Sequence, residues 1–93
     1  MSFDVKLHPD AVKFLVSLNP ETKERLKSGI KNLEMDPFKS RPPHADIKKL
    51  KGTKKRNDLY RLRIGDYRMI YSVEENTIFI LEIIPRERGY DWL

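Results

Sequence analysis

The sequence predicts an α+β domain: a two-helix hairpin packed on one face of a small, curved, mostly antiparallel sheet, in the order β-α-α-β-β-β-β. Apolar residues recur at helical spacing in the first third of the chain, and at strand spacing in most of the remainder. The helices need one sheet face for burial, which leaves the other face partly open. A chain of 93 residues is the size of one folding unit, so residues 1–93 are expected to form a single domain.

The amino-terminal part is predicted to contain an edge strand and two helices. Residues 3–7 alternate apolar and polar side chains, as in a half-buried strand. Apolar residues at helical spacing predict a first helix over about residues 9–18. Asn19 suits the N-cap of a second helix and Pro20 its first position. This helix should end just before Pro37, which disfavours helical geometry in the residue that precedes it.

The carboxy-terminal part is predicted to contain strands joined by polar loops. Residues 37–47 include three prolines and are expected to form a surface loop. Residues 50–52 could form a short strand, and residues 53–57 a polar connection. Residues 77–84 are nearly continuous in apolar side chains, which favours an interior strand that ends at Pro85.

The most informative segment is a predicted β-hairpin over residues 58–73. Gly65-Asp66 can form its two-residue turn, because glycine and aspartate accept the positive φ angles of such turns. The turn fixes the register, and strand alternation then sorts the side chains onto two faces. The apolar face is predicted to carry Tyr60, Leu62, Ile64, Tyr67, Met69, Tyr71 and Val73.

The opposite face of this hairpin is predicted to carry three arginines. Arg63 lies opposite Arg68, and Arg61 lies opposite Ile70. Like charges directly opposite one another are unfavourable, and a bound polyanion would offset this repulsion. A solvated cationic face without a ligand is the alternative.

Positive charge is concentrated in the middle of the chain. The whole chain carries a net charge of +5, whereas residues 48–71 hold nine Lys and Arg and two Asp and Glu, a net charge of +7. Such a basic segment is typical of nucleic-acid binding, although an acidic protein could also use it. The candidate nucleic-acid-binding residues outside the arginine face are Lys48, Lys49, Lys51, Lys54, Lys55 and Arg56.

Composition excludes several classes of site. The chain contains no cysteine, so thiolate zinc sites and thiol nucleophiles are excluded. Apolar runs are too short to cross a bilayer and the first residues lack a signal-peptide pattern, so a cytoplasmic location is expected and no membrane association.

Three motifs resemble the RelE/ParE superfamily of toxins from type II toxin–antitoxin pairs, and the archaeal-type RelE members in particular. They are Leu-Lys-Gly at residues 50–52, the hairpin sequence at residues 59–71, and Pro-Arg-Glu-Arg-Gly-Tyr at residues 85–90. Their order and approximate spacing match the family over nearly the whole chain. The resemblance implies the RelE-like fold, which agrees with the architecture argued from periodicity.

The resemblance also implies an activity and partners. RelE-like toxins are endoribonucleases, many of them ribosome-dependent, that cleave mRNA in the A site and so inhibit translation. The ribose 2′-hydroxyl attacks the adjacent phosphate, and no metal or cofactor is needed. The implied partners are a cognate RelB-like antitoxin, the ribosome and mRNA, and the toxin–antitoxin complex is expected to bind operator DNA.

Five residues match catalytic positions of the family. By resemblance, Arg68 contacts the scissile phosphate, and Arg86 stabilises the leaving group or the developing charge. Arg61 and Arg63 occupy positions where the best-known active site has lysines. Arginine can clamp a phosphate but holds its proton too firmly to act as a general base, so the base stays unassigned. Tyr90 either stacks on a base or assists proton transfer, or packs the carboxy-terminal tail.

Three other ionisable residues are candidates for a chemical or structural role. His44 could act as a base near neutral pH, although an exposed loop histidine is the default. His8, before Pro9 at a strand–helix junction, is expected to be structural. Glu82 interrupts an apolar strand, and we expect it to form an ion pair with a basic group.

Two other functions are compatible with the same sequence. One is a ParE-type toxin, which inhibits DNA gyrase and cuts no RNA; fold alone does not separate the two activities. The other is a non-catalytic toxin homologue that acts as an antitoxin-bound operon regulator. The tail motif and the three arginines favour the ribonuclease.

Overall fold

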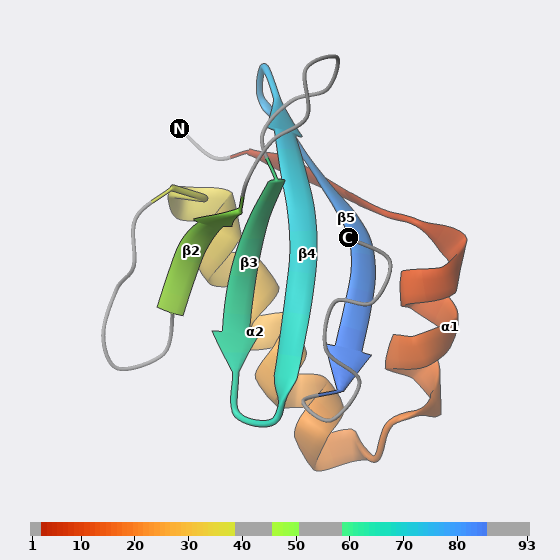
Figure 1. The fold of residues 1–93 in the computed structure, drawn as a ribbon. Coiled ribbons are helices and arrows are strands. Elements are labelled where there is room, and N and C mark those ends of the chain that lie inside the picture. Colours follow the sequence, from red (N-terminus) through yellow and green to blue (C-terminus); the bar gives the residue numbers. More distant parts are fainter. Residues whose placement is uncertain (1–2, 39–45, 51–58, 86–93) are drawn as a thin grey trace.

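The computed structural model describes residues 3–38, 46–50 and 59–85, and it confirms the predicted fold class and element order (Figure 1). Two helices and five strands follow one another along the chain. They are β1 (Asp4–Leu7), α1 (Pro9–Ser17), α2 (Pro20–Met35), β2 (Asp46–Leu50), β3 (Leu59–Ile64), β4 (Tyr67–Glu74) and β5 (Thr77–Pro85).

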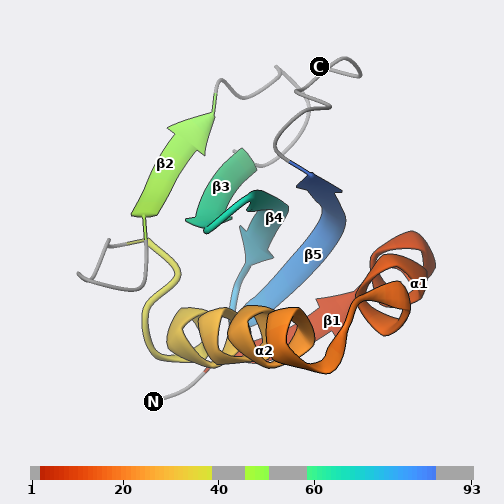
Figure 2. The same cartoon turned by 90° about the horizontal axis from the view of Figure 1, so that it is seen from below.

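The five strands form one sheet in the order β1-β5-β4-β3-β2. Neighbouring strands are antiparallel except β1 and β5, which pair in parallel. The first strand is therefore an edge strand, as its alternation predicts, and β5 is interior. Figure 2 shows both helices on the same side of the sheet. The opposite face, turned toward the viewer in Figure 1, is called the open face below.

Side-chain caps begin both helices. The Asp10 backbone N–H donates to His8 Nδ1 at 3.1 Å, so His8 has the structural role that its position predicts. The Thr22 backbone N–H donates to Asn19 Oδ1 at 2.8 Å, which confirms Asn19 as the N-cap of α2. Each cap satisfies a helix N–H that has no partner within the helix. The second helix ends at Met35, close to the predicted boundary.

The hydrophobic core lies between the helices and the sheet. The hairpin register is the predicted one: Leu62 pairs with Met69 and Ile64 with Tyr67 across the turn at residues 65–66. Gly65 has a φ of +55°, which glycine adopts without strain. The buried cluster comprises Ala11, Leu26, Leu33, Leu62, Met69, Tyr71, Ile78, Ile80 and Ile83, with Tyr60, Ile64, Tyr67 and Val73 packed against it.

The position of β2 differs from its prediction. This strand begins at Asp46, within the segment predicted to be a loop, and ends at Leu50, where a short strand was expected to begin. Pairing with β3 explains the difference, because it places Ile47 opposite Leu62 and so extends the sheet over the core. Alternation of apolar and polar residues predicts this strand poorly, because an edge strand keeps many polar side chains. The predicted connection at residues 53–57 lies outside the described residues.

A buried tyrosine joins the sheet to the chain after α2. The Tyr71 hydroxyl donates to the Pro37 carbonyl oxygen at 2.5 Å. Its ring stacks on Tyr60 with ring centroids 5.6 Å apart, and Phe38 meets Tyr60 edge-on. Burial raises the pKa of Tyr71, and the nearby Tyr60 and Asp36 raise it further. The hydroxyl therefore remains a donor to Pro37 over the ordinary pH range.

We predict that Tyr71→Phe lowers the free energy of unfolding by about 1–3 kcal/mol, because it leaves the buried Pro37 carbonyl without its donor. Urea unfolding measures this loss. Tyr67→Phe is the matched control: Tyr67 packs edge-on against Phe14, and no hydrogen bond of its hydroxyl is found within the described residues. Equal stability losses in the two variants would contradict the assignment.

We predict that Gly29→Ala destabilises the protein by about 1 kcal/mol, although alanine is the better helix former. A Cβ at Gly29 would overlap Ile64 Cδ1 and lie 3.3 Å from Leu62 Cδ2, so either the Ile64 side chain would have to turn away or α2 and β3 would have to separate. Ile64→Val removes the overlapping methyl group. In urea unfolding, Gly29→Ala should therefore cost less in the Ile64→Val background than in the wild type, and an unchanged cost would rule out this contact as the cause.

Candidate nucleic-acid interface

The candidate interface lies on the open face, toward the β3–β4 turn. Strand register arranges its side chains in two rows that cross the sheet from β2 to β5. Side chains in a row lie on one face, because paired residues in a sheet point the same way. Nearer the turn is the row Asp46, Arg63, Arg68 and Ile84, and behind it lies the row Lys48, Arg61, Ile70 and Glu82.

The three arginines therefore share one face, as the alternation predicts; Arg61, Arg63 and Arg68 are called the arginine patch below. Arg63 pairs directly with Arg68. Ile70 and Ile84 lie beside these arginines and are buried, at 0% and 1% exposure, outside the main core cluster. The patch thus combines positive charge with an apolar floor, on which long arginine stems can lie.

Arg61 is a largely buried cation of the patch. Only 15% of its side chain is exposed. Its Nη2 donates to Asp46 Oδ2 at 3.3 Å, and 59% of the Asp46 side chain is exposed. The Arg61 Nε is buried, and no hydrogen-bond partner for it is found within residues 3–38, 46–50 and 59–85. A buried donor without an acceptor is unusual in a folded protein and costs free energy.

Arg63 and Arg68 differ from Arg61 in exposure. Arg63 is exposed, and no ion pair of its guanidinium is found within residues 3–38, 46–50 and 59–85. Arg68 is half-buried beside it. The exposed guanidinium of Arg63 can meet an oxyanion from solvent, and arginine binds phosphate with two parallel hydrogen bonds.

The other predicted site residues do not all lie on the open face, and several lie outside the described residues. Lys48 lies on the open face opposite Arg61, whereas Lys49 pairs with Tyr60 and belongs to the helix-covered face. Glu82 lies across Ile70 from Arg61, and the expected ion pair of Glu82 is not found among the described residues. The remaining candidates lie outside the described residues: His44, Lys51, Lys54, Lys55, Arg56, Arg86 and Tyr90.

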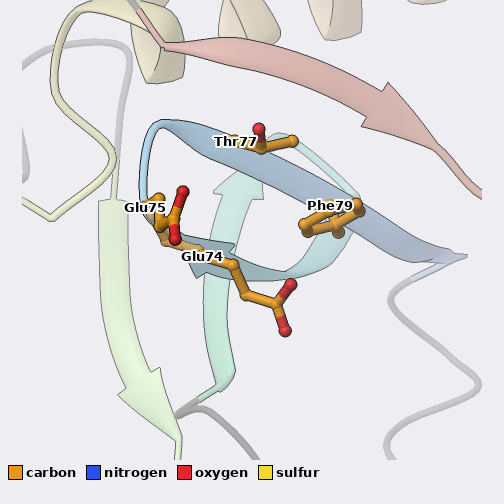
Figure 3. A pocket seen from close by; sticks show the side chains of 5 residues that line it. Glu74, Glu75, Thr77 and Phe79 are labelled. Carbon is orange, nitrogen blue, oxygen red and sulfur yellow. The ribbon is translucent and has the colours of Figure 1, made fainter.

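A hollow of about 560 Å³ lies at the other end of β4 and β5, around their turn (Figure 3). The carboxylates of Glu74 and Glu75 and the ring of Phe79 line it, together with Val73 and Thr77. The two carboxylates would repel a phosphate. Because β4 carries Arg68 near its start and Glu74 at its end, the hollow and the arginine patch are separated along the sheet.

Sequence analysis did not identify Asp46 as part of the site. Its place follows from the β2–β3 pairing, and the predicted loop over residues 37–47 concealed it. Within the described ranges, no group of three or more His, Cys, Asp or Glu side chains could hold a metal ion. In the same part of the chain, neither helix has the length and apolar character needed to span a membrane.

Comparison with known proteins identifies the family. The model of the family described as "ParE toxin of type II toxin-antitoxin system, parDE" matches residues 5–90. The chain belongs to the RelE/ParE superfamily of toxins. It is 35% identical over 92 residues to the putative toxin RelE1 of Methanocaldococcus jannaschii, and the match covers 97% of each chain. The stated resemblance is thereby confirmed.

Two solved structures of this toxin family carry the same fold. A chain of the archaeal RelE–RelB complex from Pyrococcus horikoshii OT3 is 40% identical, with a TM-score of 0.78 over 96% of this chain and 100% of that one. A chain of the RelB–RelE antitoxin–toxin complex from Methanococcus jannaschii is 28% identical, with a TM-score of 0.68 over 94% and 96% of the two chains. The RelE-like α+β fold is therefore confirmed.

We predict that Arg61→Ala and Arg61→Met affect stability differently. Alanine removes the stem that packs beside Ile70 and should cost about 1 kcal/mol. Methionine keeps much of that stem and removes the Nε that lacks a partner, so it should leave the free energy of unfolding unchanged or raised. Urea unfolding measures both. Equal losses in the two variants would show that the guanidinium itself stabilises the fold.

Proposed function

We propose that this toxin is a ribosome-dependent endoribonuclease that cleaves mRNA in the A site by metal-independent attack of a ribose 2′-hydroxyl. The observation that carries the proposal is the arginine patch: three guanidinium-bearing side chains share one open sheet face, and the exposed Arg63 stands opposite Arg68. A phosphate backbone would bind there and offset the repulsion between them. The family resemblance supplies the reaction.

The chemistry assigns the arginines to charge stabilisation. Attack on the phosphate builds negative charge on the phosphorane, and preorganised cationic donors stabilise such charge. In this proposal Arg68 contacts the scissile phosphate, Arg63 clamps it from the exposed side, and Arg61 lies in the next row. Arg86 would stabilise the leaving oxygen. Arginine holds its proton too firmly to accept one from the 2′-hydroxyl, so another group takes that role, and Tyr90 is proposed to stack on a base or to assist proton transfer.

Binding of the message would extend beyond the patch. Lys48 lies beside Arg61 on the open face and is proposed to contact the RNA backbone. The other proposed RNA contacts are Lys51, Lys54, Lys55 and Arg56. Lys49 is withdrawn from the predicted set, because its pairing with Tyr60 places it on the helix-covered face. A protein that works on the ribosome would act in the cytoplasm.

A RelB-like antitoxin is the proposed regulatory partner. The Pyrococcus horikoshii and Methanococcus jannaschii relatives were solved as RelE–RelB complexes. An acidic antitoxin segment that covers the arginine patch would compete with RNA for the same charges. The complex is further proposed to bind operator DNA.

We predict that primer extension on programmed ribosomes detects A-site cleavage by the wild type, and that Arg68→Ala reduces it by about 10²–10³-fold, the usual effect of removing one transition-state donor. Arg86→Ala should reduce it similarly. The control is Lys31→Gln, which removes an exposed charge from α2 in the helix layer. All variants must first show cooperative urea unfolding. Cleavage that is equal in Arg68→Ala and wild type would refute the site.

Gyrase inhibition is the second candidate function, because the matching family model is that of the ParE toxins. Absence of any cut by folded wild-type protein would remove the ribonuclease proposal. A supercoiling assay would then decide between inhibition of DNA gyrase and the non-catalytic, antitoxin-bound regulator, which would affect neither RNA nor gyrase.

A further inference from the structure

We propose that Asp46 is an internal competitor of the RNA phosphate for Arg61, and so sets the affinity of the toxin for its message. The inference rests on the proposed RNA-binding function of the open face. In the free protein the Asp46 carboxylate holds the Arg61 guanidinium, and on RNA binding a phosphate replaces it.

The geometry of the pair is that of a weak contact. One nitrogen of Arg61, Nη2, meets one oxygen of Asp46, Oδ2, at 3.3 Å. Hydrogen bonds between a guanidinium and a carboxylate are commonly about 2.7–2.9 Å long and often doubled. The Asp46 side chain is 59% exposed, so water screens the attraction and the pair contributes little to stability. A phosphate that binds more closely can therefore displace this carboxylate.

The Nε–H donor of Arg61 indicates which chemical group can displace Asp46, namely one that presents two acceptor oxygens. The buried Nε has no acceptor among the residues that the structure describes, while the neighbouring Nη2 faces Asp46. Once Asp46 is displaced and the guanidinium turns toward solvent, a phosphate that presents two oxygens to its Nε and Nη2 edge would satisfy both nitrogens at once, as a bidentate pair. It would thus gain a hydrogen bond that the single Asp46 contact does not supply, and remove the cost of a buried unsatisfied N–H.

Strand register explains why Asp46 is placed to compete. It begins the edge strand β2 and is the direct partner of Arg63, with Arg61 on the adjacent row of the same face. Lys48 is the direct partner of Arg61, and a nearby carboxylate offsets the repulsion between these like charges. In the free protein Asp46 reduces the repulsion among these cations, and in the complex the RNA backbone takes over that role.

The test measures binding of a short fluorescent 2′-O-methyl RNA, which lacks the attacking hydroxyl, to the full-length free toxin by fluorescence anisotropy. Asp46→Asn should tighten binding by roughly twofold to fivefold, the equivalent of one solvent-exposed ion pair. The salt dependence of the affinity should steepen, because Arg61 then displaces a condensed cation from the RNA while no displaced carboxylate takes one up. Unchanged or weaker binding by folded Asp46→Asn would overturn the inference.

A double-mutant cycle separates competition for Arg61 from a general change of charge. In the Arg61→Met background, Asp46→Asn should tighten binding less than in the wild type, since the contested cation is absent and only the general change of charge remains. Glu82→Gln is the matched control: it removes a carboxylate from the same face, and Glu82 has no contact with Arg61 among those found. Its effect on affinity should be the same with and without Arg61. Equal tightening by Asp46→Asn in both backgrounds would also overturn the inference.

The same assay separates this inference from the proposed function. If Arg63→Ala and Arg68→Ala leave RNA affinity unchanged, the open face does not bind RNA and the proposed function fails. If those variants weaken binding while Asp46→Asn has no effect that depends on Arg61, the RNA-binding face stands and only the competition fails.

Discussion

The register of the β3–β4 pair is the constraint on which both the core and the candidate site depend. Leu62 and Met69 point into the core because they face one another across the hairpin, and the same pairing directs Arg63 and Arg68 to the other face. A shift of one residue would exchange the two faces and bury the arginines. Burying unpaired guanidinium groups is prohibitively costly. The two-residue turn at Gly65 fixes the register and therefore determines both which residues form the core and which face carries the arginine patch.

Repulsion among the crowded cations of the open face destabilises the free protein, and carboxylates on the neighbouring strands reduce this repulsion. Asp46 on β2 and Glu82 on β5 flank the cations on the open face, while Glu74 and Glu75 are kept at the far end of the sheet. The carboxylates near the patch lower repulsion without removing the net positive charge. This is typical of a binding surface, where a ligand completes a charge balance that the free protein leaves incomplete.

The sequence predicted those features that depend on neighbours along the chain. The caps at His8 and Asn19 and the hairpin register follow from local spacing and turn chemistry. Contacts between distant segments were missed. The Tyr71–Pro37 hydrogen bond and the Asp46–Arg61 ion pair join residues 34 and 15 positions apart. The start of β2 was missed for the same reason: only its pairing with β3 distinguishes Asp46 and Ile47 from the proline-rich loop before them.

The separation of core and open face also explains why this fold can serve more than one target. Residues that hold α2 against the sheet, such as Leu26, Gly29 and Leu62, lie on the side away from the arginines. Changes on the open face can therefore alter what is bound and leave the packing intact. RelE and ParE toxins can share one scaffold for this reason. The target of this toxin therefore depends on the charges of its arginine patch and on the groups that contact it, such as Asp46 beside Arg61.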